Sequence, residues 1–191
     1  MKIEDRMLKR RRETANEYHT PKLGVYHASQ IHDIYSGRLK PENFFKPQNF
    51  SDATLMIFEI GHMYHEYIQN MYPKEQVEIP FVLDYQDFKI VGRTDLLLEV
   101  PCELKTCSTL PKNFYAAHNS QLQCQIAAAE KEHGFVTYIE KNPKRIVTKS
   151  FKIPKDEYLF NSIVEKVKEF HDKLVELQKV AVPDETKPNT K

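Results

Sequence analysis

Apolar and polar positions alternate along this chain with two periods, which together predict helices and strands in mixed order. The helical period predicts helices over residues 3–19, 51–72, 111–133 and 155–179, and a short strand followed by a helix over 24–37. The two-residue period predicts strands over 76–85, 88–100, 102–107, 135–140 and 146–153. The sequence therefore predicts one mixed α/β (α+β) domain.

Capping and turn residues set the expected ends of several elements. Ser29 or a neighbour is expected to cap the helix that ends at Gly37, and Ser51 or Asp52 the helix after it. Gly134 is the expected left-handed terminator of the helix that starts near residue 111. These boundaries divide the chain into a charged N-terminal arm (1–23), a folded domain (24–180) and a flexible tail (181–191).

Charge and composition narrow the classes of partner. The 191 residues are 40% hydrophobic and carry a net charge of +1, so any contact with nucleic acid must be local. The basic candidates are residues 9–12 and the segment 141–152, although such runs are often solvated faces. With no apolar run long enough to span a bilayer and no signal core, the sequence predicts an intracellular, cytoplasmic protein, in the host cytoplasm if it is viral, with no membrane partner.

The cysteines exclude two further classes of site. Cys102, Cys107 and Cys124 are odd in number and form no CxxC pair. This pattern argues against a disulfide framework and against a zinc or iron-sulfur site. We expect them to be small buried apolar groups.

The segment 88–108 predicts a β-hairpin that carries ionisable groups. Pro101 is expected to mark its turn, because proline cannot donate to a strand ladder. With the turn centred near residues 99 and 100, Asp95 lies opposite Glu103 or Leu104, and Glu103 and Lys105 share one face. Two carboxylates and an ammonium in this pattern indicate a hydrolytic phosphodiester site that uses Mg²⁺ or Mn²⁺. The alternative is a row of solvated charges on the outer face of a hairpin.

Two helices bring further polar groups to the same region. Gly61 and His65 lie one turn apart in the helix over 51–72, and an interior glycine there indicates close approach of another element or a ligand. A hydrogen-bonded histidine is the simpler interpretation of His65 alone. Gln121 and Gln125 share one face of a later helix, where their amides could bind phosphate, bases or the lysine, or face solvent. Glu78 could also face the site, although an edge position is the simpler expectation.

Four motifs follow one another in chain order on helix, strand, strand and helix: Gly61-x3-His65, Gly92-x2-Asp95, Glu103-x-Lys105 and Gln121-x3-Gln125. This arrangement resembles the PD-(D/E)xK nuclease superfamily. Within it, the chain is similar to the RecB-like branch, which includes CRISPR-associated exonucleases and viral and phage recombination nucleases. The resemblance covers about residues 24–153 and implies a restriction-endonuclease-like core, a central mixed sheet flanked by helices.

The resemblance also implies roles for single residues. His65, Asp95, Glu103 and the Leu104 backbone carbonyl look like ligands of Mg²⁺ or Mn²⁺. Lys105 looks like the catalytic lysine, and with Asp95 and Glu103 it forms the catalytic set together with Gln121, which in the family helps to position the lysine and the DNA. The DNA-binding residues expected are Gln125, Tyr115, Lys144, Arg145 and Lys149.

Two features depart from the family pattern. Gln125 stands where tyrosine is usual, so the resemblance does not carry over the contact attributed to that tyrosine. The cysteines that hold an iron-sulfur cluster in the CRISPR-associated members have no counterpart here. We therefore expect a cluster-free relative, whose last helix closes the fold by apolar packing.

The function expected is that of a metal-dependent DNA nuclease. It would be an exonuclease on single-stranded DNA or duplex ends, in recombination, repair, viral replication or CRISPR adaptation. The alternative is a non-catalytic DNA-binding or adaptor protein that retains the fold. The sequence leaves open exonuclease against endonuclease, polarity, DNA against RNA, homo-oligomers and recombination or replication partner proteins.

Overall fold

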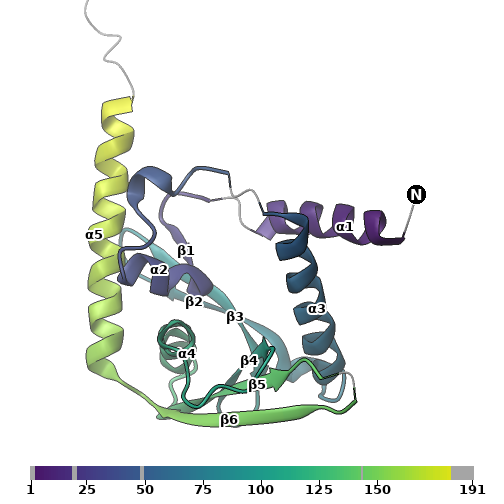
Figure 1. Cartoon of the computed structure of the whole chain (residues 1–191). Coiled ribbons are helices and arrows are strands. Elements are labelled where there is room, and N and C mark those ends of the chain that lie inside the picture. The colour runs from purple at the N-terminus through teal and green to yellow at the C-terminus, as the bar shows by residue number, and fades with distance from the viewer. Residues whose placement is uncertain (1–2, 19–20, 48–49, 143, 182–191) are drawn as a thin grey trace, which may run out of the picture.

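The computed structural model describes residues 3–18, 21–47, 50–142 and 144–181, which form a mixed α/β fold with a central six-stranded sheet flanked by five α-helices (Figure 1). The elements, in chain order, are α1 (Ile3–Tyr18), β1 (Val25–His27), η1 (Ala28–Gln30), α2 (Ile31–Tyr35), η2 (Pro41–Asn43), α3 (Asp52–Gln69), η3 (Lys74–Gln76), β2 (Val77–Asp84), β3 (Lys89–Leu97), β4 (Pro101–Cys107), α4 (Ala116–Ala128), β5 (His133–Glu140), β6 (Val147–Pro154) and α5 (Glu157–Ala181). The predicted central mixed sheet is confirmed. None of the described helices is long and apolar enough to cross a membrane.

Strand β3 is the centre of the sheet, because three other strands pair with it. β2 runs antiparallel along one edge of β3, from Lys89 to Leu96. The opposite edge is shared: β1 pairs in parallel with residues 89–91, whereas β4 pairs antiparallel at Leu96 and Leu97 only. Between these two pairings, residues 92–95 of β3 have no partner strand on that edge among the described residues. We call this open stretch of the β3 edge the fork.

The core beside β1 is rich in aromatic residues. Tyr26 of β1 is fully buried, and its ring contacts Phe44, Phe88 and Phe170 at centroid distances of 5.6–6.0 Å. Its hydroxyl shares a hydrogen bond of 2.9 Å with Nδ1 of His171. We call these five residues the aromatic core.

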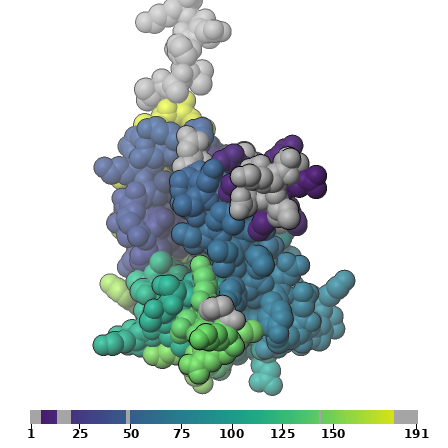
Figure 2. Space-filling view, turned by 45° about the vertical axis from the view of Figure 1, so that its right-hand side comes forward, coloured from purple at the N-terminus to yellow at the C-terminus, as the bar shows by residue number. Residues whose placement is uncertain are grey.

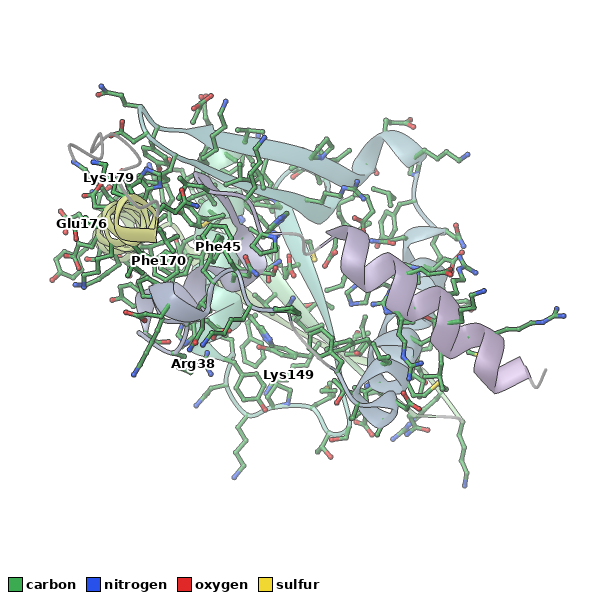
Figure 3. The ribbon with its side chains drawn as sticks, turned by 90° about the horizontal axis from the view of Figure 1, so that it is seen from above. Arg38, Phe45, Lys149, Phe170, Glu176 and Lys179 are labelled. Carbon is green, nitrogen blue, oxygen red and sulfur yellow. The ribbon has the colours of Figure 1, made fainter. Side chains whose placement is uncertain are left out.

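Helix α5 closes the aromatic core by apolar packing, as predicted for the last helix. Its buried apolar residues are Ile163, Val167, Phe170 and Leu174. Viewed from above, Phe170 lies on the side of α5 that faces Phe45, and Glu176 and Lys179 lie on the outer side (Figure 3).

Two predicted helix boundaries are wrong. The helix expected from residue 111 begins at Ala116 and ends at Ala128, and the left-handed residue after it is Glu130, with φ 52°. Gly134 instead lies in β5, where a Cβ would come within 2.9 Å of both Leu122 Cδ1 and the Pro101 carbonyl. Glycine is therefore needed there for close packing of α4 on β5.

The predicted caps and turn have mixed outcomes. Ser51 caps α3, because its hydroxyl accepts from the Thr54 amide at 3.2 Å, as predicted. Ser29 does not cap α2, because it lies inside the 3₁₀ turn η1. The hairpin turn is centred on Glu99 as expected, but Pro101 is the first residue of β4, a position that proline tolerates.

The sequence predicts a charged arm at the start of the chain and a tail at its end. α1 begins at residue 3 as predicted and contacts α3 through the ion pairs Arg11 with Glu59 and Arg12 with Asp52. The arm boundary at residue 23 stays a prediction. Of the predicted tail, residues 182–191 lie outside the described residues.

Candidate active site

The fork brings together side chains from both faces of the sheet. α4 packs on one face through Leu122 and Ile126, and α3 packs on the other through Tyr64 and Ile68. Figure 1 shows the two helices on either side of β4. Because β3 and β4 separate beyond their two paired residues, side chains from α3 reach Asp95 and side chains from α4 reach Arg93 and Glu103 at the fork.

In the fork, the side chain of Asp95 accepts a β4 backbone hydrogen bond that a paired strand would otherwise accept. Its Oδ2 accepts a hydrogen bond of 2.6 Å from the Leu104 amide of β4. A strand residue directs its N–H and C=O toward the same edge, so the Leu104 carbonyl also points toward the fork. The predicted proximity of Asp95 to residues 103 and 104 is thus confirmed.

Glu103 and Lys105 share the face of β4 that α4 covers. Glu103 Oε1 lies 2.6 Å from Lys105 Nζ, with 2% of the glutamate side chain and 24% of the lysine side chain exposed. Lys105 Nζ also donates to Gln121 Oε1 at 3.1 Å, and Gln125 Nε2 donates to Glu103 Oε2. These residues are not solvated charges on an outer face. Both glutamines face the carboxylate–lysine pair.

His65 enters the site from α3. Its Nδ1 lies 3.8 Å from Asp95 Oδ1, beyond hydrogen-bonding distance. Burial, followed by the nearby Lys105 cation, lowers the pKa of His65 to about 4, so the imidazole is neutral at neutral pH. Gly61 permits this approach of α3, because a Cβ there would lie 3.1 Å from the Thr106 hydroxyl of β4.

The charges at the fork do not balance. Burial and the Glu103 carboxylate raise the pKa of Asp95 well above its usual value. Burial lowers the pKa of Lys105, but the two carboxylates outweigh this effect and raise its pKa above the usual value. One ammonium therefore faces two acidic groups, and the site favours an additional cation.

The donor set fits a hard divalent cation. It combines two carboxylates, a neutral imidazole and a backbone carbonyl, ligands that Mn²⁺ and Mg²⁺ accept. The 3.8 Å between His65 Nδ1 and Asp95 Oδ1 is short enough for both atoms to bind one ion at about 2.1 Å. Within the described residues, however, no three side chains of His, Cys, Asp or Glu already form a preformed metal cluster.

Two residues at the fork have no counterpart in the four motifs. Gln69, in the last turn of α3, is buried, and its Nε2 donates to Glu78 Oε1 at 2.8 Å. Glu78 has φ 52°, a left-handed conformation that is strained for a glutamate inside a strand. In the β2–β3 register it lies between the Val77↔Leu96 and Ile79↔Thr94 pairs, across from Asp95. Glu78 therefore faces the site, contrary to its expected edge position.

Two of the predicted DNA contacts are not available in this arrangement. Gln125 is fully buried and bonded to Glu103, so its amide is not accessible to DNA in this arrangement. Lys149 donates to the carbonyls of Pro111 and Lys112 at 3.1 and 3.0 Å and lies 4.8 Å from the Phe151 ring centroid. Its ammonium therefore holds the loop before α4.

The other predicted DNA contacts remain accessible. Tyr115, at the N-terminus of α4, is 53% exposed, and its ring packs against His118 and Tyr138. Lys144 and Arg145 are exposed in the β5–β6 connection. In the space-filling view, this green hairpin region is separated from α1 by the blue surface of α3 (Figure 2).

A cleft of about 770 Å³ leads to the fork from the side of α1. Arg10, Arg11 and Arg93 supply cationic side chains to its lining, and Glu59 and Glu78 supply carboxylates. The aromatic rings that line it are those of Phe50, Phe58 and Phe81. Gln121, which contacts Lys105, also lines the cleft. The sequence patterns do not reveal this cleft.

Comparison with known proteins finds this fold in solved structures of low sequence identity. No protein-family model matches the chain, and no curated protein matches it. The crystal structure of SSO0001 superposes with a TM-score of 0.66 and 18% identity, over 94% of this chain and 88% of that one.

Two solved exonucleases also share the fold. An alkaline exonuclease (LHK-Exo) from Laribacter hongkongensis gives a TM-score of 0.54 and 16% identity, over 87% of this chain and 97% of that one. A phage related exonuclease from Haemophilus somnus 129PT gives 0.50 and 14%, over 85% and 98%. The chain therefore has the restriction-endonuclease-like fold expected from its sequence, a central mixed sheet flanked by helices, and shares it with these solved structures.

Proposed function

We propose that this protein is a metal-dependent DNA nuclease that acts as an exonuclease on single strands or duplex ends. The observation that supports it best is the arrangement at the fork. There the Leu104 amide donates to Asp95, and the Lys105 ammonium lies 2.6 Å from the Glu103 carboxylate. Two exonucleases among the solved structures of this fold add support. Recombination, repair, viral replication and CRISPR adaptation are the processes such an activity would serve.

In this proposal His65, Asp95, Glu103 and the Leu104 carbonyl would hold Mg²⁺ or Mn²⁺. The ion would supply charge stabilisation for the phosphate during hydrolysis. The raised pKa of Lys105 keeps it an ammonium, so it acts as a hydrogen-bond donor that orients water and phosphate oxygens, not as the base. Gln121 fixes the lysine through its Oε1.

The cleft beside α1 is the proposed path of the substrate strand. Its volume of about 770 Å³ is that of a small-ligand site, so it suits a few unpaired nucleotides better than a duplex. Cationic and aromatic side chains in one groove are typical of single-strand binding, where phosphates pair with Arg and bases stack on rings. Arg10, Arg11 and Arg93 would contact phosphates. Tyr115, Lys144 and Arg145 are proposed for strands that leave the site.

The test is a nuclease assay on end-labelled single-stranded and duplex DNA with Mg²⁺, Mn²⁺ or EDTA. We expect cleavage that EDTA abolishes and that Lys105→Ala and Asp95→Ala both lose, and the product ladder gives the polarity. Cleavage that survives both substitutions would contradict the site. Metal-independent DNA binding without cleavage would favour the adaptor alternative.

A further inference from the structure

Two glutamine amides, one from each helix that borders the fork, make the same pair of contacts there. Gln125 of α4 donates its amide nitrogen to the Glu103 carboxylate and, at 3.4 Å, to the Arg93 carbonyl. Gln69 of α3 donates its amide nitrogen to Glu78 at 2.8 Å and, at 3.4 Å, to the Asp95 carbonyl. Each amide therefore joins one acidic side chain to one backbone carbonyl of β3.

The two carbonyls belong to the edge that β4 leaves unpaired. Residues 93 and 95 are two apart in β3, so their carbonyls point toward the same edge. A buried carbonyl without a donor loses the hydrogen bonds that it would make to water, so leaving it unpaired is unfavourable. An amide has two N–H groups, so one glutamine can satisfy a carbonyl and still hold a carboxylate. A regular β4 ladder would satisfy the carbonyls but hold no carboxylate.

A third glutamine, Gln123 on α4, serves as a comparison because its hydrogen bonds have a structural role. Gln123 is also buried, but its hydrogen bonds go to α4 itself and to residues at the β6–α5 connection, not to the fork. Its Nε2 donates to Asn119 Oδ1 and the Pro154 carbonyl, each at 3.0 Å, and its Oε1 accepts from the Asp156 amide at 2.9 Å. Gln125, by contrast, is fully buried while its Oε1 has no hydrogen-bond partner among the described atoms. An unsatisfied buried acceptor calls for an explanation beyond packing, whereas the hydrogen bonds of Gln123 account for its burial.

We propose that Gln69 and Gln125 are positioning residues that fix Glu78 and Glu103 in the orientation needed to bind the divalent cation. This inference rests on the proposed function. It assigns to Gln125 a role directed at Glu103 and not at DNA. It also adds Glu78, held across from Asp95 in its left-handed conformation, to the acidic groups that surround the cation.

The test compares the variants Gln125→Met and Gln69→Met with the control Gln123→Leu in the full-length chain. Replacing the amide by a thioether keeps the length of the side chain and removes the two donors without adding a charge to the site. We expect Mn²⁺ affinity, measured by isothermal titration calorimetry, to fall about 10–100-fold in both variants, as for other residues that orient metal ligands. Gln123→Leu should lose thermal stability but keep the wild-type Mn²⁺ affinity.

Steady-state kinetics supply a second readout. Loss of positioning should lower kcat at saturating Mn²⁺ and leave KM for DNA within about twofold of wild type. A raised KM with unchanged Mn²⁺ affinity would overturn the inference and make Gln125 a substrate contact. Equal Mn²⁺ weakening in Gln123→Leu would also overturn it, because the effect would then be structural.

The two proposals fail in different ways. A wild-type protein that binds Mn²⁺ but does not cleave DNA would refute the nuclease function, and the calorimetric comparison would still decide the role of the glutamines. A wild-type protein that does not bind Mn²⁺ would refute both.

Discussion

The two halves of β3 differ in the buried polar groups that lie beside them: those of one half are neutral and paired, and those of the other are mainly acidic. In the N-terminal half, beside β1, the buried polar atoms of Tyr26 and His171 satisfy one another at 2.9 Å and are surrounded by aromatic rings. In the C-terminal half, at the fork, Asp95 and Glu103 outnumber the single Lys105 ammonium. The same strand therefore has one end built for stability and one end built for a charged ligand.

This difference separates what each region contributes. The aromatic core gains from burial of apolar surface and leaves no charge to neutralise. The fork buries two carboxylates, at a cost in free energy that stability alone does not explain. Substitutions at the two ends of β3 should therefore affect different measurements.

The largest expected effect is on activity at the fork. Lys105→Met and Asp95→Asn should each lower kcat/KM by about 10²–10⁴-fold, because each removes a group that contacts the reacting atoms in the proposed mechanism. Removing the Asp95 charge should leave the free energy of unfolding unchanged or higher in EDTA, since its raised pKa shows that burying the charge is unfavourable. Asp84→Asn, at an exposed carboxylate paired with Lys89, is the control for both measurements.

The next effect is on stability at the aromatic core. Phe170→Ala should lower the free energy of unfolding by about 3–5 kcal/mol, measured by urea denaturation, because it leaves a cavity against Tyr26 and Phe44. The folded fraction should keep its kcat. Tyr158→Ala, at an 85% exposed position on the same helix, should change stability by less than about 0.5 kcal/mol. An equal loss in both variants would contradict the assignment of this core.

A smaller effect concerns substrate affinity in the cleft. Replacing Arg10 and Arg11 together with Gln should raise KM for single-stranded DNA several-fold and leave kcat unchanged. The slope of log affinity against log salt should become shallower by about 0.7 for each phosphate that the variant no longer neutralises. Lys9→Gln, on the same helix but outside the cleft lining, is the matched control. An unchanged salt slope in the double variant would exclude α1 from the substrate path.

The smallest effect is a pH dependence of stability from His118. Burial, followed by the Lys105 cation, lowers its folded pKa to about 4 from an ordinary value of 6.5. As the pH falls, His118 therefore binds a proton in the unfolded state before it does so in the folded state. His118 thus lowers the free energy of unfolding as the pH falls from about 6.5 toward 4. His118→Asn should make the fall in melting temperature between pH 7 and pH 5 shallower. A slope equal to that of wild type would show that His118 does not carry this effect.

Much of the fold follows from local pattern, whereas the details of the site depend on tertiary contacts. Ser51 and the strand alternation around Asp95 are local signals, and the structure agrees with them. Local pattern makes Gly134 the end of a helix, but its role is set by α4 packing on β5, which residue spacing does not show. Glu130 takes the left-handed conformation although its residue type gives no warning.

The four motifs place the main groups of the site but not those that support them. Spacing brings Glu103 and Lys105 to one face of a strand, and the structure agrees. Gln69 and Glu78 carry no motif, because their roles arise only where β3 and β4 separate. The burial of Gln125 likewise depends on how closely α4 approaches Glu103.

The hydrogen bond between Tyr26 and His171 also bears on how the chain folds during synthesis. It joins residues 145 positions apart, so the Tyr26 hydroxyl lacks this partner, and its ring lacks the contact with Phe170, until α5 has left the ribosome. All residues of the candidate active site, from His65 to Gln125, emerge before that point. The nascent protein can therefore assemble its charged centre early, and its last helix completes the burial of the first strand.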